Sequence, residues 1–241
     1  MPPLGTASTF AVLAGTTVTN TGTSTVNGDL GLSPGISVTG FPPGTVNGTQ
    51  HISDATAAAA QTDLTTAYSN AAGQAPTTSG LSAIGGGPAL TPGVYNASSS
   101  LGVSGTVTLD GQGDPNAVFI FQIGSMLTTA SGSAISLTNG AQACNVFWQV
   151  GSATLGTGSA FVGSILALTS ITITTGNTIV GRVLALNGAV TLDDDTVSAR
   201  SCTLEGSPLV SLPGAAAAGI AGLAGLGWFL IRRKKTGALA R

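Results

Sequence analysis

The sequence has almost no positive charge. Only seven of its 241 residues are lysine or arginine, and the first of them is Arg182. Binding to nucleic acid requires cations that neutralise phosphates, so that class of function is strongly disfavoured. Charged residues of both signs make up 7% of the chain, and His51 is the single histidine. So few ionisable side chains argue against acid–base catalysis, and we predict no catalytic residue, metal ion or cofactor.

Cysteine is also scarce. Cys144 and Cys202 are the two cysteines, and outside the cytoplasm an even number is interpreted first as a disulfide. A bridge between them would close a long loop and contribute on the order of 4 kcal/mol to stability. Two unpaired, buried thiols are the alternative.

Small and hydroxyl-bearing residues are abundant instead. The chain has 36 glycines and 34 threonines, and 42% of its residues are hydrophobic. This composition favours an all-β or repeat protein over a helical enzyme. Near the start, threonines at positions 17, 19, 21, 23 and 25 alternate with other residues. In one extended strand they would share a face.

The end of the chain predicts a membrane anchor. Residues 215–231 (AAAAGIAGLAGLGWFLI) carry no charge and are followed at once by RRKK. We expect a transmembrane or sorting helix there, after a linker over 204–214 and before a cytoplasmic tail over 232–241. A buried core helix is the alternative. The protein would then lie outside the cell or on its surface, with the membrane as one partner.

The start of the chain lacks an export signal. The first ten residues, MPPLGTASTF, contain neither a basic region nor a long apolar core, although the predicted location requires export. We therefore expect the sequence to start late, with the signal peptide missing and residues 1–3 as a remnant.

An internal repeat organises the second half of the chain. LGTGSAFVGSILAL (155–168) aligns without gaps with ITTGNTIVGRVLAL (173–186) at an offset of eighteen residues. A third partial copy, AVTLDDDTV, follows at 189–197. Short periods of β-branched segments and Gly/Thr turns indicate a β-solenoid in which each period is one coil. A β-sandwich is the competing all-β fold.

One segment breaks the β pattern. SDATAAAAQTDLTTAYSNAAG begins at Ser53 and ends at Gly73. Ser53 or Asp54 can cap a helix N-terminus, and Gly73 stands where a terminating glycine belongs. We predict a helix over about 54–72, whose narrow stripe of mostly small residues packs flat along the solenoid.

Several separate blocks resemble one family. LGTASTFAVLAGTTVTNTGTSTVNGDLGLSPG (4–35), the alanine-rich helix, LTPGVY (90–95), AVFIFQIGS (117–125) and CNVFWQVGSATLGTGSAFVGSILA (144–167) are similar to the ice-binding domain of the DUF3494 type. The resemblance implies a discontinuous right-handed β-solenoid of triangular section over 4–203, with one α-helix alongside. It also implies a monomer that adsorbs to ice crystals, inhibits their growth or recrystallisation, or tethers the cell to ice.

The family's ice-facing side often carries a Thr-Ala/Gly-X-Thr/Asn motif. Thr175-Gly176-Asn177-Thr178 matches it in full, and we expect Thr175 and Asn177 to point outward. Thr157-Gly158-Ser159-Ala160 departs at its last position, and Thr129-Ala130-Ser131-Gly132 and Thr21-Gly22-Thr23-Ser24 match less well. The resemblance therefore implies ice contact by Thr157, Ser159, Ala160, Thr175, Asn177, Thr178, Thr129, Ser131, Thr21 and Thr23. In the third copy, Asp193-Asp194-Asp195-Thr196 replaces the motif with charge.

Other interpretations remain open. The three aspartates could bind calcium, although a solvated turn is expected because no spaced ligand set accompanies them. Threonine and glycine are also simply good strand and turn residues. The alternative function is a non-catalytic adhesion or polysaccharide-binding module. Its faces should expose Trp or Tyr, whereas Phe119, Phe121, Phe147 and Trp148 stand in apolar segments that predict a core.

Overall fold

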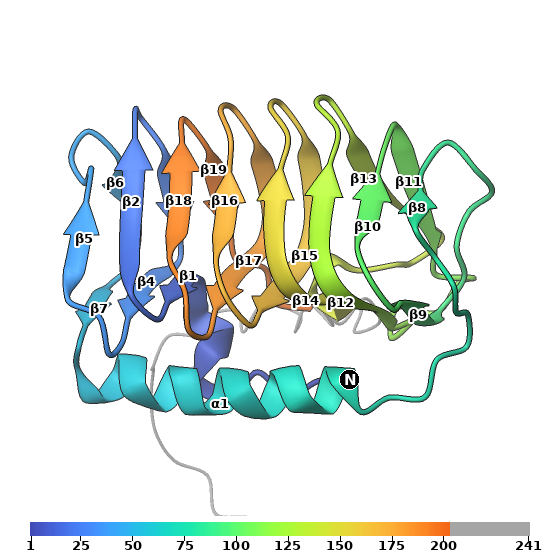
Figure 1. Cartoon of the computed structure of the whole chain (residues 1–241), viewed down its shortest axis with the longest axis horizontal. Helices are drawn as coiled ribbons and strands as arrows, with labels where there is room; N and C mark the ends of the chain where they lie inside the picture. The colour runs from blue at the N-terminus through green and yellow to red at the C-terminus, as the bar shows by residue number, and fades with distance from the viewer. Residues whose placement is uncertain (203–241) are drawn as a thin grey trace, which may run out of the picture. The chain divides into compact units, whose positions relative to one another are not determined.

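The computed structural model of the protein describes residues 1–202. Their 19 strands form one continuous sheet, wound into coils so that every pairing between neighbouring coils is parallel. Each coil turns through three faces, which we name the front face, the back face and the helix face. Figure 1 views the solenoid with the front face toward the reader and α1 (Ala55–Ala72) beneath it.

Each face is a ladder of strands in parallel register. The front face contains β5 (Ser37–Thr39), β2 (Thr17–Thr21), β18 (Val190–Asp193), β16 (Ile171–Ile173), the C-terminal parts of β14 (Val146–Leu155) and β12 (Phe119–Thr129), β10 (Leu101–Val103) and β8 (Ala83–Ile84). The back face contains β6 (Thr45–Val46), β3 (Thr25–Asn27), β19 (Thr196–Ser198), the N-terminal parts of β17 (Thr178–Ala185) and β15 (Ala160–Ala167), β13 (Ala134–Thr138) and β11 (Thr106–Asp110).

The helix face completes the triangle. It contains β7 (Gln50–Ile52), β4 (Asp29–Leu32), β1 (Phe10–Ala14), the C-terminal parts of β17 and β15, the N-terminal parts of β14 and β12, and β9 (Gly93–Ala97). The predicted repeat is confirmed here, because Ala160 pairs with Thr178 and Ala167 with Ala185 in unbroken register. Eighteen residues separate the members of each pair, so the sequence offset equals one coil.

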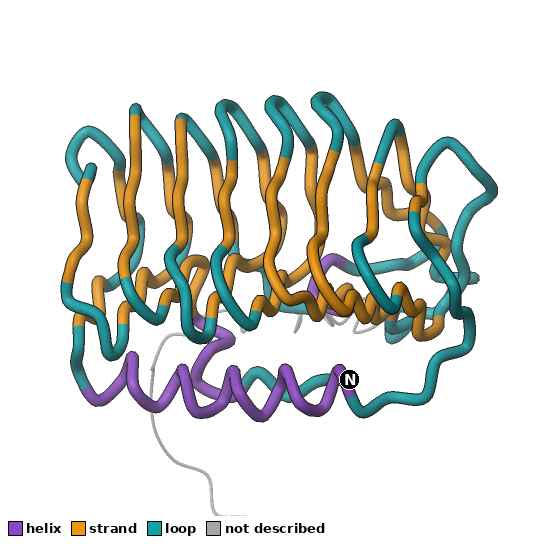
Figure 2. Tube along the Cα trace, viewed as in Figure 1, coloured by secondary structure: helices purple, strands orange, loops and turns teal. Residues whose placement is uncertain are grey.

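The order of the coils is not the order of the chain. From β1 the chain winds two coils to one end of the solenoid, and α1 with the loop that follows it then carries the chain back to the other end (Figure 2). The later coils return toward the start, until β18 pairs with β2 and β19 pairs with β3. We name this junction the seam. β1 lies on the helix face between β17 and β4 and supplies the third strand of the seam coil.

The helix forms and packs as the sequence predicts. The Asp54 carboxylate accepts a hydrogen bond of 2.8 Å from the Ala57 N–H, which caps the N-terminus. Small side chains let α1 lie close to the sheet, and its buried stripe meets large apolar residues of the helix face. The stripe consists of Ala57, Ala60, Leu64, Ala67 and Ala71, and the opposing residues include Phe10, Leu13, Ile120, Phe147, Leu166 and Leu184.

Aromatic side chains stack inside the wide end of the solenoid. Tyr95, Phe121, Trp148 and Phe161 come from successive coils, with ring centroids 5.2, 3.9 and 5.1 Å apart. The Trp148 indole N–H donates a hydrogen bond of 2.9 Å to the Val162 carbonyl, so its one polar atom is satisfied. The expectation that Phe119, Phe121, Phe147 and Trp148 lie in the core is confirmed, since all four are buried.

The expected fold class needs one correction. It included a C-terminal transmembrane helix, but no helix within residues 1–202 is long and apolar enough to cross a membrane. Residues 215–231, to which the prediction referred, lie outside the described residues, as do the predicted linker and basic tail. The fold class of the described chain is therefore a mainly β solenoid with one packed helix.

Candidate functional site

A single row of threonines runs along the front face. Register pairs connect Thr128 to Thr154, Thr154 to Thr172, Thr172 to Thr191, Thr191 to Thr19, and Thr19 to Thr39. We name these six residues the threonine row. Their side chains are exposed or half-buried, while their neighbours along each strand point into the core. Coils in parallel sheets stack about 4.7–4.9 Å apart, so the row repeats at that interval.

The hydroxyl groups of the threonine row are free to meet an external partner. Within residues 1–202, none of the six makes a side-chain hydrogen bond to another protein group. The row two positions earlier on each strand consists mostly of small residues, including the paired residues Thr17 and Ser37, but it contains Met126 beside Ser152 at one end. The β-branched threonines have few rotamers, so the surface is regular before any contact is made.

The back face carries a less uniform row. Thr106, Ala134, Ala160, Thr178, Thr196, Thr25 and Thr45 follow one another in register. Two of the seven positions are alanine, and the neighbouring row contains the paired valines Val162 and Val180. Of the predicted ice-contacting residues, Ala160 and Thr178 lie on this face.

Most other predicted residues lie at the corner between the front and back faces, where the loops at the top of Figure 1 are. Thr157, Thr175, Ser131, Thr21 and Thr23 are exposed there. The Thr157 hydroxyl lies 3.3 Å from that of Thr174, and the Thr175 hydroxyl donates to the Asp193 carboxylate. Thr129 is buried, and its hydroxyl accepts a hydrogen bond of 2.9 Å from the Gly156 N–H.

The expected outward orientation of Asn177 is wrong. Asn177 is 1% exposed and the equivalent Ser159 is 2% exposed. The glycine before each adopts positive φ, 80° at Gly176 and 67° at Gly158, which breaks the alternation of an extended strand. The third motif residue therefore turns inward and fills the corner.

These inward residues form a ladder between coils. The Ser159 N–H donates to Asn177 Oδ1 at 2.9 Å, the Asn177 N–H donates to Asp195 Oδ1 at 2.7 Å, and the Asp195 N–H donates to Ser24 Oγ at 2.9 Å. The ladder satisfies backbone groups that the corner would otherwise leave buried without partners. It crosses the seam, since Ser24 belongs to the N-terminal coils.

The acidic turn is more structured than a solvated loop. Asp195 is 1% exposed and its Oδ2 accepts a hydrogen bond of 2.8 Å from the Asp193 N–H. Burial raises the pKa of the Asp195 carboxyl above its ordinary value. Asp194 Oδ1 accepts from the Thr23 N–H at 2.6 Å, again across the seam. Within residues 1–202, no three His, Cys, Asp or Glu side chains are arranged so that they could hold a metal ion.

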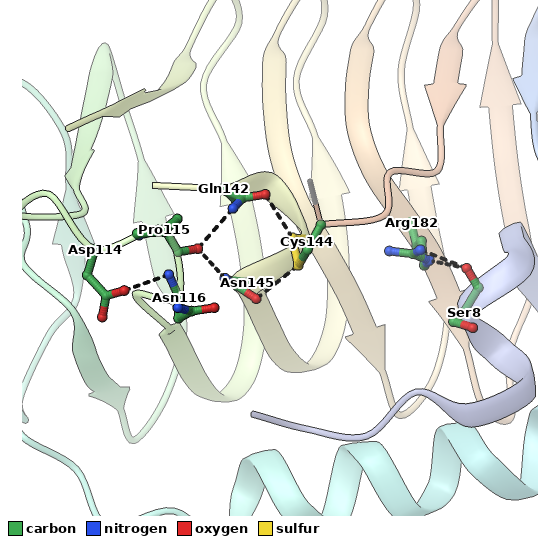
Figure 3. Close-up of a disulfide and its surroundings, with 9 residues drawn as sticks. Ser8, Asp114, Pro115, Asn116, Gln142, Cys144, Asn145 and Arg182 are labelled. Carbon is green, nitrogen blue, oxygen red and sulfur yellow. Dashed lines mark hydrogen bonds between the residues drawn. A yellow bond between two sulfur atoms is a disulfide. The ribbon is translucent and has the colours of Figure 1, made fainter. Parts of the chain in front are cut away.

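The two cysteines are joined. Figure 3 shows the disulfide between Cys144 and Cys202, whose Cα atoms are 5.3 Å apart. Cys144 belongs to a short 3-10 helix, η2 (Ala143–Asn145), ahead of β14. The bridge therefore attaches the chain after the last coil to the middle of the solenoid.

Groups with catalytic potential are not gathered in the described part of the chain. His51 contacts Asp54 at 2.7 Å beside the helix N-terminus, and this is the one ion pair in residues 1–202. The hydrogen bonds from Ala57 and His51 lower the pKa of the Asp54 carboxyl, as expected for a capping group.

Comparison with known proteins now adds to this geometry. Residues 12–198 match the family described as "Ice-binding-like". The chain belongs to the ice-binding-like family. It is 59% identical over 169 residues to an ice-binding protein of Nostoc sp. (strain HG1). The aligned region covers 70% of this chain and 62% of that relative. It is 38% identical over 186 residues to an ice-binding protein of Flavobacterium frigoris (strain PS1), covering 70% and 66%. The chain thus spans about two thirds or less of these relatives' length.

Solved structures of ice-binding proteins share the fold. A protein from an Antarctic biological consortium superposes with a TM-score of 0.80 at 51% identity, covering 82% of this chain and 91% of that chain. The DUF3494 domain of Shewanella frigidimarina ice-binding protein 1 gives 0.74 at 32% identity, covering 83% and 100%. The family that the sequence blocks resembled is therefore confirmed, together with the solenoid and its helix.

The threonine row itself was not among the predicted site residues. Thr19 was noted within the run of alternating threonines, but that run does not stay on one face. β2 ends at Thr21, Gly22 turns the corner at φ 77°, and Thr25 lies on the back face. The other members of the row lie far apart in the sequence, and only the register of the coils brings them together.

Proposed function

We propose that the protein binds ice through its front face, with the threonine row as the centre of contact. The observation that carries this proposal is a single residue type at equivalent positions of six consecutive coils. A repeat of 4.7–4.9 Å is close to a repeat of the ice lattice. A flat and regular surface of this kind can match a crystal at many points at once.

Threonine suits this role for two physical reasons. Its methyl group orders the adjacent water into a cage, and its hydroxyl can join that water as donor and acceptor. Its stiff χ1 also lowers the entropy lost when the surface meets the crystal. Lysine and arginine, which are strongly hydrated and mobile, are absent from the whole sequence before Arg182.

The predicted motif residues would have two different roles in ice binding. Thr157, Thr175, Thr21, Thr23 and Ser131 border the front face at the exposed corner, where they would extend the contact. Ser159, Asn177 and Thr129 are buried and would hold the corner in shape. Ala160 and Thr178 lie on the back face, so their contribution is the weaker expectation.

The setting of this activity is outside the cytoplasm. A disulfide between Cys144 and Cys202 persists in oxidising compartments, and ice adjacent to a cell forms outside it. We propose that the domain acts at or beyond the cell surface and is not catalytic.

A sugar-binding or adhesive role is less well supported. Modules that bind polysaccharides expose aromatic rings for stacking, but no aromatic residue within residues 1–202 is fully exposed. Phe41 and Tyr68 are half-buried, and the others are buried.

The decisive experiment measures recrystallisation of fine ice by purified variants. Thr172→Tyr places a bulky ring at the centre of the threonine row and should abolish most of the inhibition. Thr66→Tyr on the exposed side of α1 is the matched control and should behave like the wild type. Thr178→Tyr and Ala160→Tyr test the back face, and Thr175→Tyr tests the corner. If Thr172→Tyr retains full activity while a back-face variant loses it, the front-face assignment fails.

A further inference from the structure

The two arginines of residues 1–202 line the same cavity, and no lysine occurs in this range. Arg182 and Arg200 both line one open cavity of about 240 Å³. Its walls are the N-terminal segment from Met1 to Ser8, Phe147 and the Cys144–Cys202 disulfide. The cavity lies where the beginning and the end of the described chain meet, and it is separate from the front face.

Arg182 is buried, and no residue within 1–202 provides a counter-ion for it. Its side chain is 4% exposed, in β17 on the helix face. No carboxylate of residues 1–202 lines the cavity, and the one acidic side chain of that range within reach of a basic one is Asp54, which contacts His51. Placing a cation in such a site is costly unless an anion or several acceptors compensate it.

Hydrogen bonds offset part of the cost of burying the Arg182 guanidinium. Its Nε and Nη2 donate hydrogen bonds of 2.9 and 2.7 Å to one acceptor, the Ser8 carbonyl. A guanidinium has five N–H groups, so three remain without an acceptor in the described chain. Figure 3 shows that the remaining nitrogen of Arg182 points away from Ser8, in this view toward the side where Cys144 lies.

We propose that this cavity is a binding site for a carboxylate group, held by Arg182 and Arg200. The free edge of a guanidinium presents two parallel N–H donors, which match the two oxygens of a carboxylate. Arg200 is exposed at the rim and adds a second positive charge. The burial of Arg182, which lowers the pKa of its guanidinium, would be offset by the bound negative charge.

Two sources of the carboxylate share this chemistry. One is a small free carboxylate, for which acetate is the probe. The other is Glu205, the single glutamate of the chain, which follows Cys202 by three positions in the sequence.

The test combines NMR with thermal unfolding of the full chain. Sodium acetate should shift the Arg182 Nε–H resonance saturably, and at ten times its Kd it should raise Tm by roughly 3–5 °C. Sodium chloride should need a higher concentration for the same shift, because it cannot bind two donors in parallel. An acetate response that persists in Arg182→Gln, or an equal response to chloride, overturns the proposal.

Two further variants keep the result interpretable. Arg200→Glu supplies a carboxylate at the rim, so it should be more stable than Arg200→Gln and insensitive to acetate. If Glu205 is the source, the wild type should not respond to acetate, whereas Glu205→Gln should lose stability and regain it on adding acetate. The proposal fails if neither the wild type nor Glu205→Gln responds and Arg200→Glu is no more stable than Arg200→Gln.

Discussion

Thr191 in β18 lies directly beside Thr19 in β2, although the two residues come from opposite ends of the described chain. The threonine row therefore crosses the seam without interruption. If the row acts as one surface, Thr19→Tyr and Thr191→Tyr should each reduce inhibition of ice recrystallisation to the same extent. The measurement is the growth rate of ice grains at matched protein concentration. Loss in only one of the two variants would mean that the contact surface stops at the seam.

The methyl and hydroxyl groups of the row can be separated at Thr172. Thr172→Val keeps both branches of the side chain and its stiffness but removes the hydroxyl, and Thr172→Ser keeps the hydroxyl but removes the methyl. Because the methyl orders the adjacent water, we expect Thr172→Ser to lose more activity than Thr172→Val. The concentration that halves recrystallisation should rise several-fold for Ser and less for Val. The reverse order would assign the main role to the hydroxyl.

Trp148 should be the most costly single residue to truncate. It is 0% exposed and lies 3.9 Å from the Phe121 ring, almost parallel to it. Trp148→Ala leaves a cavity and removes the hydrogen bond to the Val162 carbonyl, so we expect a loss of about 3–5 kcal/mol in the free energy of unfolding. Urea unfolding measures it. Phe41→Ala, at a half-buried position of the end coil, is the comparison and should cost clearly less.

Asp195 should make stability depend on pH. Burial raises the pKa of its carboxyl in the folded state, with repulsion from Asp193 adding to the effect. The native state therefore holds the proton more tightly than the unfolded chain. The stability linked to that proton is present below the unfolded pKa and is lost as pH rises through the folded pKa.

Asp195→Asn tests this sign, and Asn177 already occupies the equivalent place one coil away. The Tm of Asp195→Asn minus that of the wild type should be larger at pH 7 than at pH 3. Taking the difference removes the contributions of other carboxyl groups, such as that of Asp54, whose lowered pKa acts in the opposite direction. A difference that does not change with pH would contradict the prediction.

Removing the disulfide should destabilise the domain without changing the front face. The bridge spans a sequence separation of 58 residues, for which chain entropy alone gives about 4 kcal/mol. The double variant Cys144→Ser, Cys202→Ser should unfold at a lower urea concentration, with a free energy of unfolding reduced by about 4 kcal/mol. The reduced wild type should show the same loss of stability. Both should still inhibit recrystallisation in the cold. A double variant as stable as the oxidised wild type would show that the bridge contributes little.

The sequence predicted those parts of the fold that depend on local or strictly periodic signals. The offset of eighteen residues between segments 155–168 and 173–186 corresponds to one coil, because the two copies have equal length and pair in register. The helix was predictable from its cap, its alanines and its terminal glycine. The repeat and the helix signals each lie within a short stretch of chain, so the sequence alone is enough to recognise them.

The threonine row and the seam could not be predicted in the same way. Successive members of the row lie 26, 18 and 19 residues apart from Thr128 to Thr191, because the coils differ in length. The next neighbour of Thr191 is then Thr19, for which no sequence period exists. Asn177 was misplaced for a different reason, since the positive φ of Gly176 reverses the direction in which the following side chain points.

The seam also sets the order of events when the protein is made. The coils formed by β2–β4 and β5–β7 are synthesised early, yet their neighbour on the other side, β18 with β19, is the last part of the solenoid to emerge. The sheet cannot close at the seam until nearly the whole domain is available, so this step depends on contacts distant in sequence and is intrinsically slow. A chain interrupted before residue 190 would lack β18 and β19, so the two groups of coils would be joined through β1 on the helix face alone. Their front and back faces would end in open edges at the seam, which are prone to pair with other chains.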